Sequence, residues 1–310
     1  MKKILIYRHC PLGDFILALP AIKMIKDQNP TSKIFLAGQV NNNTGFVKPN
    51  LIPLKIKIID KYINFEYKFF SILKFFKIVK KNKFDEIYYL NKFTSNKRLM
   101  RDFIIFTLLG IKKKFGFERI KYNYRIFNET YYLCKRVNKD INKKDISFDG
   151  LFTKKTNNRK KKFITISMGG RNLKKIWKSN NWVSVTEKIL NSFPYLKIII
   201  VGSKNEIPNA EKIVKVNKFK IINMCGKTNI NALLNLIKDS KYHISHDDGT
   251  MHVASAFQKH GVAIFGKLAE KGRFYPSNPN QKIFFPKNNV NDTKPTKVSK
   301  FILNDLNKLL

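Results

Sequence analysis

Strand-like segments alternate with helix-like segments along this chain, and this alternation limits the folds open to it. Ile4 to Tyr7 is a short apolar run typical of a buried strand, and Phe15 to Lys26 repeats apolar residues at helical spacing. A second strand is predicted at Ile34 to Ala37, after a turn at Pro30 to Ser32. Strand, helix and strand in this order predict a parallel βαβ unit, so the expected fold class is α/β.

The same order of segments starts again in the second half of the chain. Phe163 to Ile166, Leu196 to Val201 and Tyr242 to Ser245 are predicted as strands. Residues 135–162, rich in Lys, Asn, Asp and Arg, are typical of a linker. We therefore predict two Rossmann-like domains, 1–155 and 156–295. Residues 296–310 are amphipathic, and we expect a helix that packs back on the N-terminal domain.

The composition is strongly basic. The 310 residues include 61 Lys and Arg against 21 Asp and Glu, so the net charge is +40 at pH 7. Nucleic-acid readers favour Arg, but only nine of these basic residues are Arg. With 43% hydrophobic residues the chain is no disordered polycation. We interpret most of the lysines as compositional, and a basic nucleic-acid-binding protein remains as a remote alternative.

Cysteines and hydropathy indicate the cellular compartment. Cys10, Cys134 and Cys225 lie far apart without a CxxC pair, so we predict neither a disulfide framework nor a zinc ribbon. Arg8 and Asp14 interrupt the first apolar run before it could form a signal-peptide core. No stretch of 18 residues is free of charge, so no segment is predicted to span a bilayer. We expect a cytoplasmic protein.

A Lys-rich amphipathic stretch runs from Glu66 to Lys81. Within it, Phe69 to Lys80 mixes apolar residues with lysines. We interpret it as a surface helix whose apolar side lies in the core and whose lysines face water. A helix that lies on a membrane surface is the alternative.

Three loops that follow predicted strands carry the candidate site residues. In open α/β sheets, ligands bind at the carboxyl ends of strands, where helix N-termini favour anions. The first loop runs from Arg8 to Asp14, and in it Gly13 permits close approach of the backbone. Asp14 lies at the start of a helix, so the alternative to a chemical role is a simple helix cap.

The second loop runs from Met168 to Trp177. Two glycines follow a strand here and are succeeded by several cations, a combination that suits a phosphate or diphosphate. The loop matches neither the P-loop pattern nor the dinucleotide-binding fingerprint. In so lysine-rich a chain, each lysine is by default a solvated charge, and only its position after a strand singles out Lys175.

The third loop runs from Ser245 to Ala256. Asp247, Asp248 and Gly249 form the turn after a strand, and the amides near Gly249 and Thr250 are predicted to point at an anion. An alternative is a metal site made by His246, Asp247 and His252, since these side chains can ligate divalent ions.

Together and in this order, the loops resemble those of glycosyltransferase family 9, the ADP-heptose:lipopolysaccharide heptosyltransferases, over nearly the whole chain. The pattern R-x-x-x-x-G-D spans Arg8 to Asp14, and the pattern D-[ST]-G-x-x-H corresponds to Asp247 to His252. Between them lie K-x-W at Lys175 to Trp177, G-x-x-x-E at Gly202 to Glu206, and G-K-T at Gly226 to Thr228.

The chain departs from the family pattern at three places. Asp248 stands where the family usually has Ser or Thr, and Thr250 where it has Pro. Lys267 stands where the Pro of the usual G-P-T lies. An acid beside a diphosphate is electrostatically unfavourable unless another cation offsets it. Asp248 and Lys267 therefore bear on the identity of the donor and on activity.

The resemblance implies the GT-B architecture and an inverting, metal-independent transfer of a heptose or related sugar. The donor would be an ADP-sugar, and the acceptor a lipopolysaccharide core or another cell-envelope glycolipid. Asp14 is implied as the general base, and Lys175 as the cation on the departing diphosphate. The implied donor-binding residues are Gly170, Arg171, Glu206, Lys227, Thr228, Asp247, Asp248, Gly249, Thr250 and His252. Arg8 and Gly13 are expected on the acceptor side.

Further expectations concern partners and rival functions. We expect no cofactor and no metal, a nucleotide-sugar donor, an anionic glycolipid acceptor, and a monomer that binds no nucleic acid. Peripheral contact with the cytoplasmic face of the inner membrane would suit such an acceptor. The alternative function is another nucleotide-sugar enzyme of the same architecture, with a different donor sugar or an epimerase activity.

Overall fold

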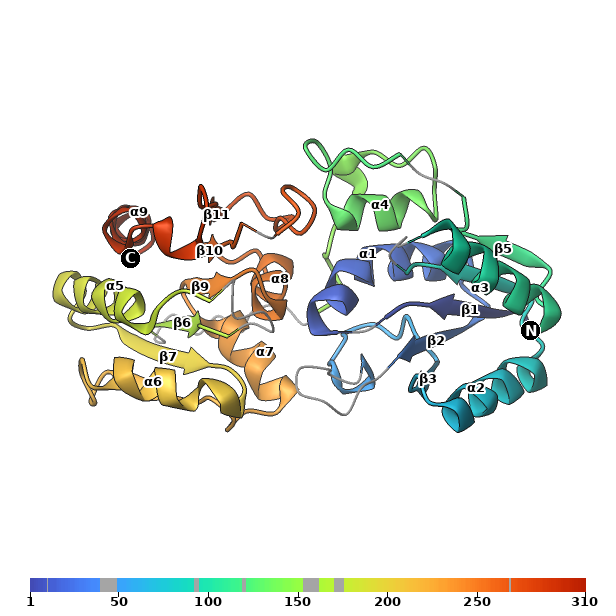
Figure 1. Cartoon of the computed structure of the whole chain (residues 1–310), viewed down its shortest axis with the longest axis horizontal. Coiled ribbons are helices and arrows are strands. Elements are labelled where there is room, and N and C mark those ends of the chain that lie inside the picture. Colours follow the sequence, from blue (N-terminus) through green and yellow to red (C-terminus); the bar gives the residue numbers. More distant parts are fainter. Residues whose placement is uncertain are drawn as a thin grey trace. The chain divides into compact units, whose positions relative to one another are not determined.

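The computed structural model describes residues 1–9, 11–39, 49–91, 95–118, 121–152, 162–169, 176–267 and 269–310. The chain divides into two compact units, Met1–Thr153 and Lys154–Leu310. Each unit contains one parallel sheet with helices packed on it (Figure 1). The predicted α/β class is therefore confirmed.

The first unit has the sheet order β3-β2-β1-β4-β5, and the four pairings are parallel. Its order reverses between β1 and β4, which places a switch point beside the loop that follows β1. The strands are β1 Lys3–Tyr7, β2 Lys33–Gln39, β3 Lys61–Phe65, β4 Glu86–Tyr89 and β5 Lys113–Phe115. The helices are α1 Leu12–Gln28, α2 Phe69–Asn82, α3 Asn96–Leu108 and α4 Glu129–Lys135, with short 3₁₀ turns at Pro49–Leu51 and Lys143–Asp145.

Aromatic side chains fill the core beneath α2 and α3. The ring of Tyr7, at the end of β1, lies 5.6 Å from Tyr89 of β4, 6.1 Å from Phe75 of α2 and 5.2 Å from Phe106 of α3, between ring centroids. Both helices therefore pack over the same face of the sheet. Helix α1 packs against α4 (Figure 1).

The second unit has the sheet order β11-β10-β9-β6-β7-β8, again with parallel pairings. Its order reverses between β6 and β9, so the second and third candidate loops both follow strands at this switch point. The strands are β6 Phe163–Ser167, β7 Lys197–Val201, β8 Ile221–Asn223, β9 His243–His246, β10 Gly261–Ile264 and β11 Gln281–Phe284. The helices are α5 Ser179–Ser192, α6 Ile207–Val214, α7 Ile230–Asp239, α8 Gly249–Ala256 and α9 Pro295–Leu309, with 3₁₀ turns at Lys204–Glu206 and Val290–Asp292.

The C-terminal helix α9 differs from the prediction. Its buried residues Val298, Ile302 and Leu306 belong to the same core cluster as Trp177 and Trp182, and the helix packs on α5. The amphipathic helix was expected on the N-terminal domain, but its apolar face lies in the core of the second unit. Amphipathicity identifies a helix that needs a partner, and it does not identify the partner.

Candidate active site

In the first unit, a buried arginine holds the predicted catalytic carboxylate. Asp14 lies in the first turn of α1, and its Oδ1 atom lies 3.1 Å from the Nη2 atom of Arg8. Arg8 follows β1 and is 2% exposed, whereas the side chain of Asp14 is 38% exposed. The residue at the helix cap is Pro11, so Asp14 is not the cap that the alternative required. The arrangement fixes an accessible carboxylate at the switch point.

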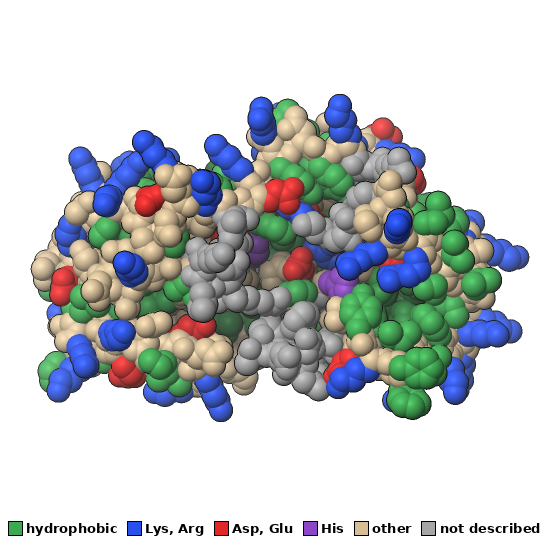
Figure 2. Space-filling view, in the orientation of Figure 1, with side chains coloured by type: hydrophobic (Ala, Val, Ile, Leu, Met, Phe, Trp, Pro, Cys, Tyr) green, Lys and Arg blue, Asp and Glu red, His purple; other side chains and the backbone are tan. Residues whose placement is uncertain are grey.

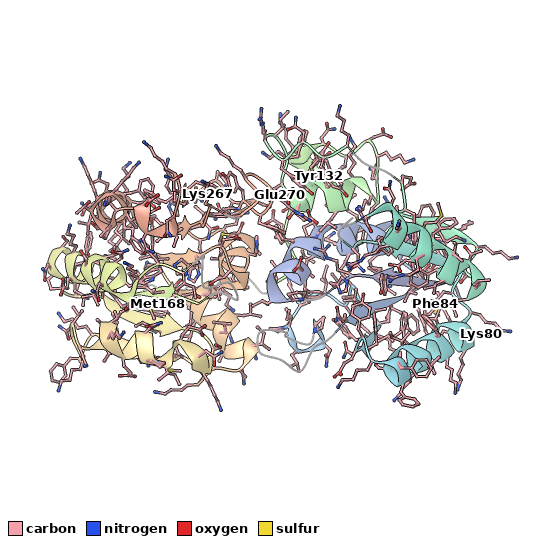
Figure 3. The ribbon with its side chains drawn as sticks, in the orientation of Figure 1. Lys80, Phe84, Tyr132, Met168, Lys267 and Glu270 are labelled. Carbon is pink, nitrogen blue, oxygen red and sulfur yellow. The ribbon has the colours of Figure 1, made fainter. Side chains whose placement is uncertain are left out.

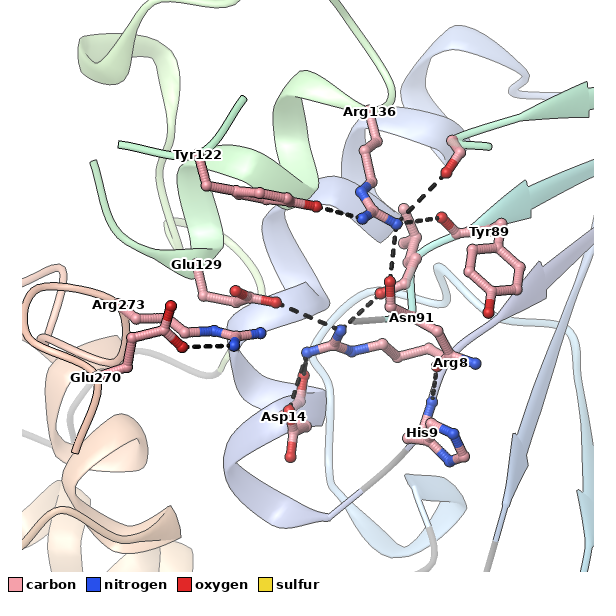
Figure 4. A network of polar contacts seen from close by, with 12 residues as sticks. Arg8, His9, Asp14, Tyr89, Asn91, Tyr122, Glu129, Arg136, Glu270 and Arg273 are labelled. Carbon is pink, nitrogen blue, oxygen red and sulfur yellow. Dashed lines mark hydrogen bonds and ion pairs between the residues drawn. The ribbon is translucent and has the colours of Figure 1, made fainter. Parts of the chain in front are cut away.

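Arg8 is itself fixed by the fold (Figure 4). Its Nη1 atom donates to the carbonyl of Leu90 at 2.6 Å and lies 3.8 Å from Oε1 of Glu129, a buried residue of α4. Asn91, next to Leu90, accepts the backbone N–H of His9 through its side-chain oxygen. Arg8 was predicted on the acceptor side, and in the structure it positions Asp14. Gly13, the other residue predicted on the acceptor side, lies next to Asp14 in α1.

A second arginine braces the same end of the first sheet. Arg136 is buried and donates through Nη1 to the carbonyl of Tyr89 at 3.0 Å and to that of Asn91 at 2.8 Å. Its Nη2 atom donates to the hydroxyl of Tyr122. Sequence reasoning missed Glu129 and Arg136, because their partners lie 121 and 47 residues away in the chain. No local pattern signals contacts of that separation.

In the second unit, Asp248 is the N-cap of α8. Its Oδ1 atom accepts the backbone N–H of Thr250 at 2.8 Å, that of Met251 at 3.0 Å and the Thr250 hydroxyl at 2.7 Å. Its Oδ2 atom accepts the hydroxyl of Ser167, the last residue of β6, at 2.8 Å. Burial raises the pKa of Asp248 to about 6, although these hydrogen bonds favour the charged form.

This cap corrects the prediction for the amides at the start of α8. We expected amides near Gly249 and Thr250 to point at an anion, but the N–H of Thr250 already donates to the Asp248 carboxylate. Gly249 is the first helical residue, and His252 lies buried one turn further along α8. Asp247 is half-buried between β9 and the cap.

His246 connects the two ends of the loop that leads from β6 towards α5. Its Nε2 atom accepts the backbone N–H of Trp177 at 3.0 Å, and its Nδ1 atom lies 3.4 Å from the carbonyl oxygen of Gly169. Burial lowers the pKa of His246 to about 4, so the ring is neutral. Both ring nitrogens are used within the fold, which leaves no support for the metal alternative. Among the described residues no group of three potential metal ligands occurs.

Glu206 joins the loops after β6 and β7. Its Oε2 atom accepts the Ser203 hydroxyl at 2.5 Å in a capping box. A Cβ atom at Gly169 would lie 2.6 Å from Oε1 of Glu206, and one at Gly202 would lie 3.0 Å from Oε2. A Cβ atom at the first of these positions would therefore displace the Glu206 carboxylate. The structure thus brings the G-x-x-x-E element to the end of β6.

The remaining predicted donor residues fall into two groups. Lys227 and Thr228 follow β8, and the Lys227 ammonium donates to the carbonyl of Asn223 at 3.1 Å. Gly170, Arg171 and Lys175 lie outside the described residues.

Ser167, which donates to Asp248, is a site residue that the sequence did not single out, since a strand-terminal Ser carries no signal of its own.

Two parallel α/β units, each with polar side chains at its switch point, match the GT-B architecture. A model of glycosyltransferase family 9 (heptosyltransferase) matches residues 92–301, and the chain belongs to this family. The predicted family, architecture and enzyme class are confirmed. The family match also favours a transferase over the epimerase and nucleic-acid alternatives.

Two relatives are heptosyltransferases of Campylobacter. Lipooligosaccharide heptosyltransferase 2 of Campylobacter jejuni is 24% identical over 272 residues, covering 84% of this chain and 80% of the relative. Lipopolysaccharide heptosyltransferase 1 of Campylobacter coli is 22% identical over 343 residues, covering 98% and 95%. Both matches extend over most of each chain.

Solved structures share the fold. ADP-heptose LPS heptosyltransferase II of E. coli superimposes with a TM-score of 0.72 at 16% identity, covering 100% of this chain and 98% of that one. A family 9 glycosyltransferase of Veillonella parvula gives 0.75 at 15% identity, covering 99% and 98%. E. coli heptosyltransferase WaaC with ADP-2-deoxy-2-fluoro heptose gives 0.70 at 14% identity, covering 98% and 99%.

Proposed function

We propose that this chain transfers a heptose with inversion from ADP-heptose to the core of a lipopolysaccharide or lipooligosaccharide. The observation that carries the proposal is the Asp14 carboxylate, which is accessible and is held by the buried Arg8 guanidinium. The names of the two Campylobacter relatives support the acceptor class, and the donor analogue in the WaaC structure supports the donor.

In the proposed reaction, Asp14 accepts the proton of an acceptor hydroxyl while that oxygen attacks the anomeric carbon of the heptose. The new carbon–oxygen bond forms as the bond to the diphosphate breaks, and ADP leaves with the electron pair. Lys175 would stabilise the charge that develops on the diphosphate. Arg8 and Glu129 contribute by fixing the direction of the Asp14 carboxylate.

The donor is proposed to lie at the switch point of the second unit. Glu206 would accept hydrogen bonds from the ribose hydroxyls, and Thr228 would lie beside the base. The capped start of α8, with Asp248 in its neutral form below pH 6, would face the diphosphate with less repulsion than a fully ionised acid. Lys227, Asp247 and His252 complete the proposed donor contacts.

The first test replaces Asp14 by Asn. This variant keeps an oxygen for Arg8 but cannot accept a proton, so we expect turnover to fall roughly 10²- to 10⁴-fold. Heptose transfer to a purified, deacylated acceptor provides the rate, and calorimetric titration with ADP should show unchanged binding. Asp27→Asn is the matched control, because Asp27 lies at the exposed end of the same helix and pairs with Lys23.

Two outcomes would contradict parts of the proposal. Full activity of Asp14→Asn would exclude Asp14 as the base. Conversion of the ADP-sugar in the absence of any acceptor would identify an epimerase instead of a transferase.

A further inference from the structure

Helices α2 and α3 expose large apolar side chains that the core does not use. On α2, Phe70 is 82% exposed and Leu73 is 40% exposed, while Phe75 and Val79 on the opposite side are buried. The sequence interpretation, with the apolar side of this helix in the core, accounts for the buried residues only. The first turn of α2 leaves its largest side chains in water.

Helix α3 carries a matching exposed stripe. Met100, Ile104 and Leu108 are 61%, 50% and 79% exposed, and they recur every four residues along one side of the helix. Its buried side is formed by Asp102 and Phe106. An apolar stripe of this spacing normally packs against a partner.

The two stripes belong to the same side of the first unit. Phe75 of α2 and Phe106 of α3 both contact the ring of Tyr7 from one face of the sheet, so the outward sides of both helices lie over that face. Figure 2 shows hydrophobic side chains gathered over this part of the unit with basic side chains among them. We call this surface the α2–α3 face, defined by Phe69, Phe70, Leu73, Lys74, Lys77, Lys80, Lys81, Lys97, Met100, Arg101, Ile104 and Leu108.

The charges on the α2–α3 face have one sign. Helix α2 contains four lysines and no acid, and Lys80 lies at the periphery of the unit (Figure 3). The acid of α3, Asp102, is buried and is engaged by the Tyr89 hydroxyl at 2.8 Å and by Arg101 at 2.6 Å. A partner must therefore offer apolar volume together with negative charge.

We propose that the α2–α3 face docks the first unit on a lipid bilayer that contains anionic phospholipids. Phe70, Leu73 and the α3 stripe would enter the interfacial layer, and the lysines would reach the head groups through their flexible stems. A second copy of this chain fits less well, because two surfaces with the same positive charge repel each other. Nucleic acid fits less well too, because the α3 stripe is aliphatic and the aromatic rings of this face, Phe69 and Phe70, lie at one end of α2 and do not follow a groove along which bases could stack.

Docking on a bilayer goes beyond the proposed reaction. It rests on the proposed function in one respect, because the proposed acceptor carries a lipid anchor. A bilayer-bound first unit would search for that acceptor in two dimensions. Binding to vesicles can nevertheless be measured without donor or acceptor, so the two proposals can fail independently.

The test measures sedimentation of the full chain with vesicles of phosphatidylcholine, with and without phosphatidylglycerol. We expect binding to the anionic vesicles only, and a loss of roughly 100-fold when Lys74, Lys77, Lys80 and Lys81 are replaced by Gln. The matched charge control replaces Lys212, Lys215, Lys218 and Lys300, which are exposed residues of the second unit. The control variant should bind within about threefold of the unaltered protein.

A second pair of variants tests the apolar contribution. Phe70→Ser with Ile104→Ser should weaken vesicle binding roughly tenfold, whereas Phe219→Ser, at a residue 90% exposed in the second unit, should not. All these variants should transfer heptose to a soluble, deacylated acceptor at the unaltered rate. Asp14→Asn should lose transfer and still bind vesicles.

Several results would overturn the docking proposal. If both four-lysine variants lost vesicle binding equally, the chain would bind through its overall charge and not through the α2–α3 face. Absence of vesicle binding by the unaltered chain would exclude docking altogether. A dimer in analytical ultracentrifugation that dissociates in the Phe70→Ser, Ile104→Ser variant would identify a second copy as the occupant.

Discussion

Asp248 and Thr250 both depart from the family pattern, and in the structure they contact each other. The Thr250 hydroxyl donates to the Asp248 carboxylate at 2.7 Å and also lies 3.1 Å from Nε2 of His243. Ser167 supplies the contact to the other carboxylate oxygen. In the sequence the two departures appear unrelated, and only the acid at Asp248 is an expected obstacle to donor binding. Their direct contact shows that they form one hydrogen-bonded unit at the start of α8.

This unit makes stability depend on pH. Burial raises the folded-state pKa of Asp248 to about 6, so the folded protein binds a proton more tightly than the unfolded chain does. Stability should therefore be greater near pH 5 and be lost as the pH rises through 6. Relative to Asp248→Asn, the unaltered protein should lose about 1 kcal/mol of unfolding free energy between about pH 5 and about pH 7.5. Urea titrations of both proteins measure the difference, and a pH-independent difference would contradict it.

At the residue scale, the sequence predicts where a residue lies relative to the strands and helices better than it predicts which residues that residue contacts. The motif pattern predicted that Asp14 and Asp248 lie between a strand and the helix that follows it, and the structure places Asp14 in the first turn of α1 and Asp248 at the N-cap of α8. It could not predict that His246 bonds Trp177, 69 residues away, because such contacts depend on how the strands are ordered. The same ring was therefore open to interpretation as a metal ligand.

At the scale of elements, the strands that the sequence missed are edge strands. β3, β5 and β11 each end a sheet and carry charged or polar residues such as Lys61, Lys113 and Lys282. Central strands such as β1 and β6 are buried almost throughout, so they form continuous apolar runs. An edge strand is half exposed and gives a weaker signal, which explains why these three were missed. The edge strand β8 is the exception, because it begins with the apolar pair Ile221 and Ile222 and was predicted from it.

A substitution in α9 tests whether this helix packs in the core of the second unit, as in the structure, or on the N-terminal domain, as the sequence led us to expect. Both tryptophans of the chain, Trp177 and Trp182, are buried in the same core cluster as Ile302. Ile302→Ala should therefore lower the free energy of the unfolding transition seen by tryptophan fluorescence, by about 2–5 kcal/mol. Lys300→Ala, an exposed position on the same helix, is the control and should have little effect. An unchanged fluorescence transition in Ile302→Ala would favour packing on the first unit.

At the scale of the whole molecule, the charge of +40 has more than one consequence. The chain belongs to a glycosyltransferase family, and the proposed ADP-heptose donor is an anionic partner for which some of the positive charge is suited. The proposed docking of the α2–α3 face on anionic lipid would use several more of the lysines. Among the described residues, many of the remaining lysines are exposed, and surface ion pairs such as Lys23 with Asp27 contribute little to stability. Because 61 basic residues stand against 21 acidic ones, most of the positive charge has no acidic counterpart in the chain.

Uncompensated charge should make the folded chain more stable at higher ionic strength. Like charges repel more strongly in the compact state than in the expanded one. Raising NaCl from about 0.02 M to about 0.3 M shortens the Debye length from roughly 20 Å to roughly 6 Å, which screens this repulsion more than it weakens the buried contacts of Arg8. Tm should rise by about 2–4 °C for each kcal/mol of repulsion removed, as measured by circular dichroism. The two four-lysine variants should show a smaller rise, because each has lost four charges. A Tm that falls with salt would mean that attractive surface pairs outweigh the repulsion, and the excess lysines would then have to be held in compensating networks.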